Sequence, residues 1–295
     1  MGTAELIDQL RKIVGAGQVV TEAATLQEYS HDETEELSFL PEVVVKPRTT
    51  EEVSGILRLC NLHRVPVTPR GAGTGLSGGA LPQLGGVLIS TERMNSILEI
   101  DERNGQVITE PGVITEVLQE AVKEKGLFYP PDPSSRGSCF IGGNIAENSG
   151  GPKAVKYGVV KDYVLNLELV LPTGEIIWTG ANVLKNSTRY NLTQLVVGSE
   201  GTLGIVTKIV LRLIPLPRYD LLMLVPFRSL EKAGEAVAAI FRAGFMPSAL
   251  ELVEIDALRI TAQYLNSGIS IPEGIEAHLI IEVDGNDQPA LMNDM

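Results

Sequence analysis

The residues best suited to chemistry are glycines and small hydroxyl side chains that lie together at positions 69–80. This run reads Pro-Arg-Gly-Ala-Gly-Thr-Gly-Leu-Ser-Gly-Gly-Ala. Because glycine accepts positive φ angles, successive main-chain N–H groups of such a loop can point into one concavity and bind an anion. A pyrophosphate suits this concavity, since no side chain blocks its approach and Thr74 and Ser77 add hydroxyl donors.

The same run contains Gly73-x-Gly75-x-x-Gly78, which is the spacing of the dinucleotide-binding fingerprint. That fingerprint requires a strand before it and a helix directly after it, with the pyrophosphate on the helix N-terminus. Here a proline and two glycines follow, and the apolar segment Val87–Ser90 then predicts another strand. The sequence therefore predicts a strand–loop–strand unit and not a Rossmann unit. A flexible Gly/Ser turn is the alternative interpretation of the loop taken alone.

Three further segments rich in glycine, proline or small polar residues follow along the chain. Pro-Pro-Asp-Pro-Ser-Ser at 130–135 leads into Ile-Gly-Gly-Asn-Ile-Ala-Glu-Asn-Ser-Gly-Gly at 141–151. Tyr157-Gly158 comes next, and Val-Gly-Ser-Glu-Gly-Thr-Leu-Gly-Ile occupies 197–205. Several such segments between apolar strands suggest a long ligand that is threaded along main chain, with amide edges reading its heterocycles.

The elements that must position these loops alternate between helix and strand periodicity. Residues 1–36 predict an N-terminal helix and an acidic turn. Thr49 and Glu52 form a capping box before a helix that ends near Arg64. Another helix is expected at 115–125, with Val117 among its inward residues and Gly126 as its stop signal. Strands are expected at 42–46, 65–68, 87–90, 97–100, 106–110, 164–171, 175–178 and 204–213.

The segment 128–158 is dominated by Pro, Gly, Ser and Asn, and its low periodicity predicts a long functional loop with little regular structure. Pro215 and Pro217 mark a boundary, after which the rhythm changes. The pattern beyond it is strand, helix, strand, helix, strand, which is typical of an α+β unit. We therefore divide the chain into residues 1–36, 37–216 and 217–295.

Composition excludes several classes of partner. The net charge of −13 would repel a phosphate backbone, and no basic stripe is visible, so nucleic acid is not expected to bind. The 44% hydrophobic content fits a globular protein with a sizeable core. No apolar run approaches the length of a membrane span, and the N-terminus does not resemble a signal peptide. We expect a cytoplasmic protein.

The three motifs at 71–79, 142–151 and 198–205 together resemble the FAD-binding domain of the vanillyl-alcohol oxidase (PCMH-type) flavoprotein superfamily. Within that superfamily the chain is most similar to the group of glycolate oxidase D-subunits and D-lactate dehydrogenases. The likeness covers about residues 36–295. It implies an α+β fold, in which a PCMH-type FAD-binding domain of two α+β subdomains holds the cofactor between them. A partial ferredoxin-like α+β cap domain would follow.

The resemblance also implies which residues bind FAD. The pyrophosphate would be held by Arg70, Gly71, Ala72, Gly73, Thr74, Gly75, Leu76, Ser77 and Gly78. The flavin and its ribityl chain would be lined by Asp132, Ser135, Gly142, Gly143, Asn144, Ala146 and Gly151. The adenine or the ring edge would meet the main chain of Ile205 and Val206.

We expect FAD to be bound noncovalently. Members of the superfamily that attach the flavin covalently use a histidine or cysteine near it, whereas His31, His63 and His278 all lie outside the motifs. Cys139 is close to the second motif, but a small buried thiol of this kind is usually structural. The residues predict no metal site. In the superfamily the cap continues beyond the point where this sequence ends, with a His-rich segment that binds a divalent metal or the substrate carboxylate.

The resemblance implies a flavoenzyme that oxidises a small 2-hydroxy acid, such as glycolate or D-lactate, by hydride transfer to flavin N5. An iron–sulfur or flavoprotein subunit would accept the electrons. The sequence identifies no catalytic base. Four basic residues in or near the glycine-rich segments are candidates to hold an anion or are solvated: Arg136, Lys153, Lys156 and Arg189. Two alternatives stay open, namely oxidation of another alcohol or sugar lactone, and a flavin-holding or electron-transfer subunit or fragment without turnover.

Overall fold

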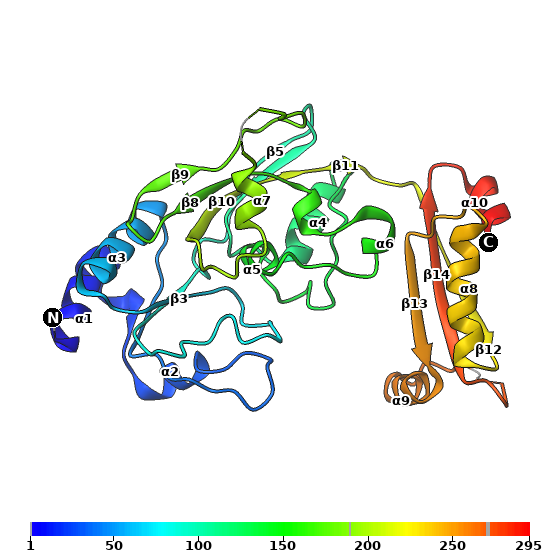
Figure 1. The fold of residues 1–295 in the computed structure, drawn as a ribbon, viewed down its shortest axis with the longest axis horizontal. Coiled ribbons are helices and arrows are strands. Elements are labelled where there is room, and N and C mark those ends of the chain that lie inside the picture. The colour runs from blue at the N-terminus through cyan, green and yellow to red at the C-terminus, as the bar shows by residue number, and fades with distance from the viewer. Residues whose placement is uncertain (1, 189, 270–271) are drawn as a thin grey trace. The chain divides into compact units, whose positions relative to one another are not determined.

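The computed structural model describes residues 2–188, 190–269 and 272–295. It is a mixed α+β structure, as predicted, and its residues group into two compact units (Figure 1). The first unit consists of Met1–Tyr129, Ser134–Ser149 and Val160–Pro215. The second consists of Pro130–Pro133, Gly150–Val159 and Leu216–Met295. The region 1–36, which the sequence set apart, falls inside the first unit.

The first unit begins with a four-stranded sheet in the order β1-β2-β4-β3. Its strands are β1 (Val19–Val20), β2 (Val43–Val45), β3 (Val67–Arg70) and β4 (Val87–Ser90). The last three run parallel, and every residue of β2 and β4 is buried, as expected for a sheet covered on both faces. The helices α1 (Thr3–Val14) and α3 (Thr50–His63) lie side by side and contribute to the same apolar core (Figure 1). The short helix α2 (Ala23–Glu28) precedes β2.

Helix α3 has the predicted start and end. The hydroxyl of Thr49 accepts a hydrogen bond from the Glu52 N–H at 3.2 Å, which satisfies one unpaired donor of the first turn. The reciprocal half of the capping box differs, because the Glu52 carboxylate accepts the N–H of Arg48 at 2.6 Å. The helix ends at Arg64, whose φ of 53° is left-handed.

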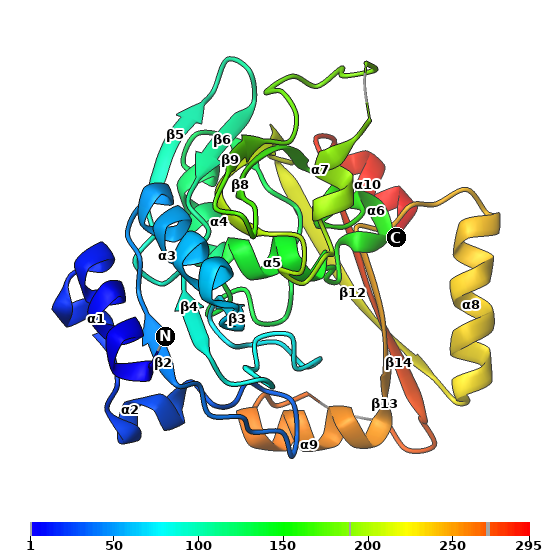
Figure 2. The same ribbon diagram turned by 60° about the vertical axis from the view of Figure 1, so that its left-hand side comes forward.

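The second sheet of this unit is antiparallel and has the order β5-β6-β10-β8-β9. Its strands are β5 (Ile97–Asp101), β6 (Gln106–Thr109), β8 (Val164–Val170), β9 (Ile176–Trp178) and β10 (Ile205–Arg212). The associated elements are α4 (Thr115–Lys123), β7 (Leu127–Phe128), α5 (Ile141–Glu147), α7 (Leu192–Val196) and β11 (Ile214–Pro215). The helix α5, which is labelled in Figure 2, contacts β10.

Two predictions, one for the segment 128–158 and one for the helix α4, are wrong. The segment 128–158 is not a long irregular loop, because it contains α5 and the one-turn helix α6 (Ala154–Tyr157). The helix α6 belongs to the second unit. The signal for α5 is the spacing of Ile141, Asn144 and Ile145, all buried, which the neighbouring glycines obscure. Val117 of α4 is 53% exposed and not inward, because the buried stripe of the helix consists of Thr115, Leu118 and Val122.

The second unit is built on the antiparallel sheet β12-β14-β13. The elements from β12 to β14 follow the predicted order: β12 (Tyr219–Phe227), α8 (Leu230–Arg242), β13 (Ala249–Glu254), α9 (Ile255–Leu265) and β14 (Ala277–Gly285). The helix α10 (Gln288–Asp294) comes after them and was not predicted. One face of the central strand, with Ala277, Leu279 and Ile281, packs against α8, which lies along the sheet (Figure 1). The hydroxyl of Ser229 caps α8 by accepting the Lys232 N–H at 3.2 Å.

Candidate functional site

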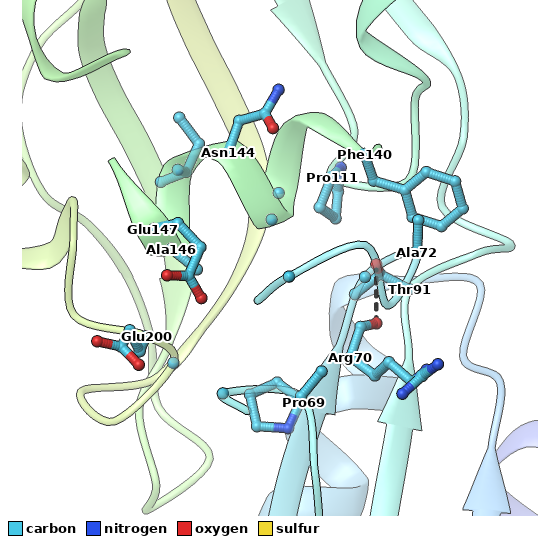
Figure 3. A pocket seen from close by; sticks show the side chains of 18 of the residues that line it. Pro69, Arg70, Ala72, Thr91, Pro111, Phe140, Asn144, Ala146, Glu147 and Glu200 are labelled. Carbon is cyan, nitrogen blue, oxygen red and sulfur yellow. Dashed lines mark hydrogen bonds between the residues drawn. The ribbon is translucent and has the colours of Figure 1, made fainter. Parts of the chain in front are cut away.

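The first unit contains a pocket where its glycine-rich segments meet. The loop that follows β3, the helix α5 and the segment that precedes β10 all contribute to its wall (Figure 3). The predicted strand–loop–strand setting of the first motif is confirmed, because β3 and β4 pair in parallel and turns and bends connect them. No helix terminus follows this loop, so main-chain N–H groups of the loop itself would have to take the place of a helix N-terminus in binding an anion.

Two glycines of the pocket are required by close approaches of the chain to itself. Gly73 has a φ of 75°, and a Cβ at this position would lie 2.6 Å from the guanidinium carbon of Arg70. A Cβ on Gly142 would lie 2.6 Å from Cβ of Pro111, whose carbonyl accepts the Gly142 N–H at 2.7 Å. These glycines fix the positions of the first loop and of α5.

Two other glycines of the pocket have no such structural reason. Gly75 and Gly143 both line the pocket, and neither has a positive φ. A Cβ on Gly143 would meet nothing within 4 Å, and one on Gly75 would meet only the Asp32 carboxylate, at 4.0 Å. The absence of side chains there leaves space along the pocket, as a ligand that contacts main chain requires. The pocket thus fits a long dinucleotide such as FAD.

The structure brings most of the predicted cofactor-binding residues together. Those that line the pocket are Arg70, Gly71, Ala72, Gly73, Thr74, Gly75, Ser135, Gly142, Gly143, Asn144, Ala146, Ile205 and Val206. Those that are not part of its lining are Leu76, Ser77, Gly78, Asp132 and Gly151. The last two belong to the second unit, where the carboxylate of Asp132 accepts the N–H of Lys153 at 3.2 Å.

Three carboxylates of the pocket were not predicted: Asp32, Glu147 and Glu200. Figure 3 shows Glu147 and Glu200 facing each other, and each has an oxygen 3.2 Å from the position of a Cβ on Gly79. Partial burial and then the negative charges of Glu200 and Asp32 raise the pKa of Glu147. Glu147 and Glu200 lie inside the glycine-rich motifs, so their place in the pocket could have been predicted from the sequence. Nothing in the sequence around Asp32 indicates that it lies in the pocket.

Cys139 also lines the pocket, and it is a buried thiol, as predicted. It is 4% exposed, and its Sγ lies 3.3 Å from the hydroxyl of Thr115. The same hydroxyl accepts a hydrogen bond from the side-chain amide of Asn144 at 2.5 Å. These contacts give Cys139 a packing role between α4 and α5.

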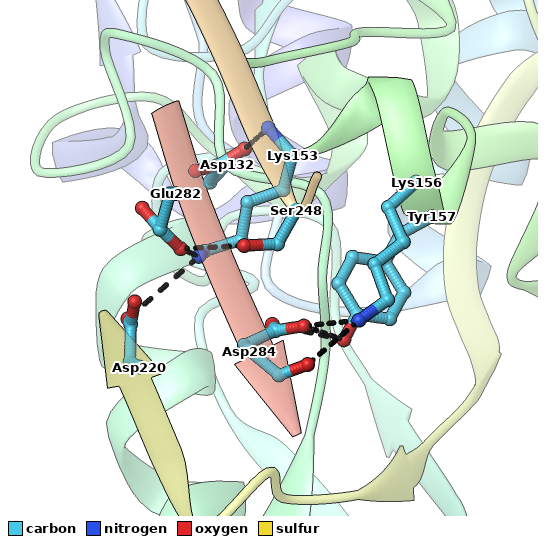
Figure 4. A network of polar contacts seen from close by, with 8 residues as sticks. All are labelled: Asp132, Lys153, Lys156, Tyr157, Asp220, Ser248, Glu282 and Asp284. Atoms are coloured by element: carbon cyan, nitrogen blue, oxygen red, sulfur yellow. Dashed lines mark hydrogen bonds and ion pairs between the residues drawn. The ribbon is translucent and has the colours of Figure 1, made fainter. Parts of the chain in front are cut away.

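The predicted anion-holding lysines are engaged by carboxylates inside the second unit (Figure 4). Lys153 forms an ion pair with Glu282, and Lys156 forms one with Asp284. Arg136, in the first unit, pairs at 3.5 Å with Glu116, and both side chains are about half exposed. Arg189 lies outside the described residues.

The histidines do not join the pocket. His31 and His63 are exposed, and His278 is buried on β14 with no hydrogen-bond partner for Nδ1 among the described residues. Within 2–188, 190–269 and 272–295, no group of three or more His, Cys, Asp or Glu side chains is arranged to hold a metal ion. In the same part of the chain, no helix has the length and apolar character that crossing a membrane requires.

Two family models match separate parts of the chain. The model described as "FAD binding domain" matches residues 41–180. The model described as "FAD linked oxidases, C-terminal domain" matches residues 216–295.

Curated relatives match almost the whole chain. The glycolate oxidase subunit GlcD of Bacillus subtilis is 44% identical over 285 residues, which are 97% of this chain and 60% of the relative. A D-lactate dehydrogenase of Anaerostipes hadrus is 39% identical, over 98% of this chain and 62% of the relative. A D-2-hydroxyglutarate dehydrogenase of Stutzerimonas stutzeri is 40% identical, over 70% of this chain and 45% of the relative. The chain thus spans about three fifths of the length of the first two relatives.

The fold is also found among solved structures. A structure of alkyldihydroxyacetonephosphate synthase superposes with a TM-score of 0.85 at 21% identity. The match covers 100% of this chain and 58% of the synthase chain. At this identity the likeness concerns the fold alone.

Proposed function

The chain belongs to the FAD-linked oxidases of the PCMH type and takes FAD as its cofactor, and on this premise we propose that it oxidises a small 2-hydroxy acid. The observation that carries this proposal is the agreement among its relatives. Three of the relatives are named for glycolate, D-lactate and D-2-hydroxyglutarate. Each of these acids has a hydroxyl group on the carbon next to a carboxylate. The simplest explanation is that these relatives share one class of substrate, the 2-hydroxy acids.

Bound FAD supplies the acceptor for the hydride that leaves the substrate carbon. The task of the chain is to hold the cofactor and to orient it. We propose that main-chain N–H groups of 70–78 hold the pyrophosphate, supported by the place of 70–75 in the pocket of Figure 3. The flavin and ribityl chain would lie along Ser135 and 142–146. Asp132 and Gly151, which do not line this pocket, are two further residues that we propose to bind FAD. The main chain of Ile205 and Val206 would meet the adenine or the ring edge.

We propose that the cofactor is not attached covalently. In support, Cys139 is the one cysteine among the pocket residues, and its sulfur is buried against Thr115. No histidine lines the pocket as described. Precipitation of the protein with acid should therefore leave FAD in the supernatant.

The whole enzyme involves more than the pocket. We propose residues 37–216 as the FAD-binding domain and 217–295 as part of the cap over the substrate. An iron–sulfur or flavoprotein subunit is our proposed electron acceptor, supported by the description of the Bacillus relative as a subunit. Lys153 and Lys156 each pair with a carboxylate in this conformation, so neither offers an uncompensated charge to the substrate.

Anaerobic reduction of the bound flavin tests the substrate class. Glycolate, D-lactate and D-2-hydroxyglutarate are added in turn to the yellow protein, with L-lactate as the control for stereochemistry. We expect at least one of the three acids to bleach the flavin absorption. Bound FAD that none of them bleaches would favour a flavin-holding subunit, whereas bleaching by a sugar lactone or a simple alcohol alone would favour the other substrate classes.

A further inference from the structure

Arg70 ends β3, and its side chain is buried behind the glycine loop. It is 8% exposed, and its guanidinium carbon lies 5.6 Å from the centre of the Tyr29 ring. On its other side the guanidinium occupies the space that a side chain on Gly73 would need. Its Nη1 atom is buried and has no hydrogen-bond partner among the described residues. Packing between an aromatic ring and the loop therefore helps to hold the guanidinium in place.

Asp32 approaches the same loop from an earlier part of the chain. It is 7% exposed and lines the pocket. Its Oδ1 atom accepts the N–H of Thr34 at 2.9 Å, whereas Oδ2 is buried and has no partner in the described part of the structure. The next residue, Glu33, donates its N–H to the carbonyl of Gly75 at 3.1 Å. The segment 32–34 is therefore attached directly to the glycine loop.

The two buried side chains carry opposite charges. Burial lowers the pKa of Arg70, and the negative charge of Asp32 opposes that lowering. A buried guanidinium without a counter-charge would destabilise the fold, because it has lost its hydration. Asp32 supplies this counter-charge without a direct hydrogen bond to the guanidinium, since its Oδ2 and the Arg70 Nη1 both have no partner in the described structure.

Asp32 and Tyr29 also lie before residue 41, where the match to the FAD binding domain begins. The glycine loop is thus supported by a segment that the family match does not include. This segment approaches the loop at Gly75 from one side, and Leu37 approaches it near Gly78, where its Cδ1 atom would lie 3.5 Å from an added Cβ.

We propose that Asp32 and Arg70 are positioning residues that brace the glycine loop from behind. The guanidinium supports the loop beneath Gly73, and the carboxylate of Asp32 compensates its charge. The brace keeps the main-chain N–H groups of the loop turned toward the cofactor phosphates, while the guanidinium of Arg70 does not bind them. This inference rests on the assignment of the pyrophosphate to this loop.

A double-mutant cycle on the full chain tests the brace. FAD dissociation constants are measured by following the fluorescence of released flavin on dilution, and ADP, which shares the pyrophosphate, is used to displace FAD. Asp32→Asn and Arg70→Met should each weaken the binding of FAD and ADP, by about fivefold or more. The double variant should lose less than the product of the two, because both buried charges disappear together. Arg70→Lys should recover part of the loss.

Glu35→Gln is the matched control, since it removes one negative charge from an exposed position in the same segment. Equal FAD dissociation constants of Asp32→Asn and Glu35→Gln would overturn the brace. A double variant whose loss of affinity equals the product of the two single losses would also overturn it. If Arg70→Met does not fold, Tyr29→Leu removes the other support of the guanidinium, with Tyr29→Phe as its control. Equal FAD affinities of these two Tyr29 variants would also refute the proposal.

Gly75→Val separates the brace from the loop assignment. If this variant keeps its FAD, the pyrophosphate is not bound at the loop and the premise fails. If it loses FAD while Asp32→Asn and Arg70→Met bind like the control, the loop assignment holds and the brace alone is wrong.

Discussion

Asp284 of β14 accepts hydrogen bonds from both Lys156 and Tyr157, which precede it by more than 120 residues in the chain. Its side chain is 3% exposed, and the Lys156 Nζ atom also donates to the Asp284 carbonyl at 2.9 Å. Within the second unit, this pair fastens the segment 150–159 to the face of the sheet opposite α8 (Figure 4).

Asp284→Asn should therefore destabilise the second unit. The change leaves the partly buried Lys156 without its counter-charge, and we expect a loss of about 2–3 kcal/mol, less than for a fully buried pair. Amide hydrogen exchange in 277–285 measures the effect locally. Asp256→Asn breaks an exposed ion pair with Arg259 in the same unit and should cost less than about 0.5 kcal/mol. Equal protection of β14 in both variants would contradict the assigned role of Asp284.

Gly143→Ala should weaken FAD binding without weakening the fold. The added methyl group meets no protein atom within 4 Å and lies in α5, where alanine is favoured over glycine by about 1 kcal/mol. It would enter the space that we assign to the cofactor, and a steric cost of about 1–2 kcal/mol corresponds to about a 5- to 30-fold rise in Kd. The control is Gly234→Ala in α8, where a Cβ also meets nothing. Identical FAD affinities of the two variants would exclude Gly143 from the cofactor site.

FAD affinity should fall as the pH rises through the pKa of Glu147. Burial and two neighbouring carboxylates raise that pKa above its ordinary value of 4.5. A raised carboxyl pKa means that the folded site favours the protonated form, so ionisation above it adds a charge that repels the phosphates. Titration of Kd between about pH 4.5 and 8 measures the step. Glu147→Gln should remove it, whereas Glu124→Gln, at an exposed site, should keep it.

Glu168→Gln should destabilise the contact between α3 and the second sheet of the first unit. The buried carboxylate of Glu168 accepts hydrogen bonds from the hydroxyls of Thr50 at 2.6 Å and Thr207 at 3.0 Å, and it pairs with Lys208 at 3.0 Å. The amide keeps one acceptor oxygen but loses the ion pair, so we expect a loss of about 1–3 kcal/mol. Urea unfolding followed by the FAD signal measures it. A midpoint equal to that of the Glu175→Gln control, on an exposed turn, would show that the network contributes nothing.

Cys139→Ser should retain FAD and release it on acid precipitation, as the unchanged chain should. The thiol packs against Thr115, so the substitution should lower the free energy of unfolding by about 1 kcal/mol. Flavin absorbance in the acid pellet of the unchanged chain, lost in Cys139→Ser, would reveal a covalent link instead.

The sequence allowed prediction of those features that a few neighbouring residues encode. The glycine loop between β3 and β4, the cap of α3 at Thr49 and the order of the elements in the second unit were all readable from local spacing and turn residues. The helix α5 was missed because its two glycines resemble a loop, although its buried positions follow a helical period. Most of the residues that the family resemblance of the three motifs implied as cofactor-binding line one pocket in the folded chain.

Contacts between distant segments were decided only in the folded chain. The hydrogen bond from Glu33 to the loop at Gly75 and the ion pair of Lys156 with Asp284 leave no pattern in the sequence. The local sequence determines which conformations a segment prefers, since its hydrogen bonds and caps lie within a few residues. Which buried charge compensates another depends on the path of the whole chain, because charge pairing across a core is set by packing and not by sequence distance.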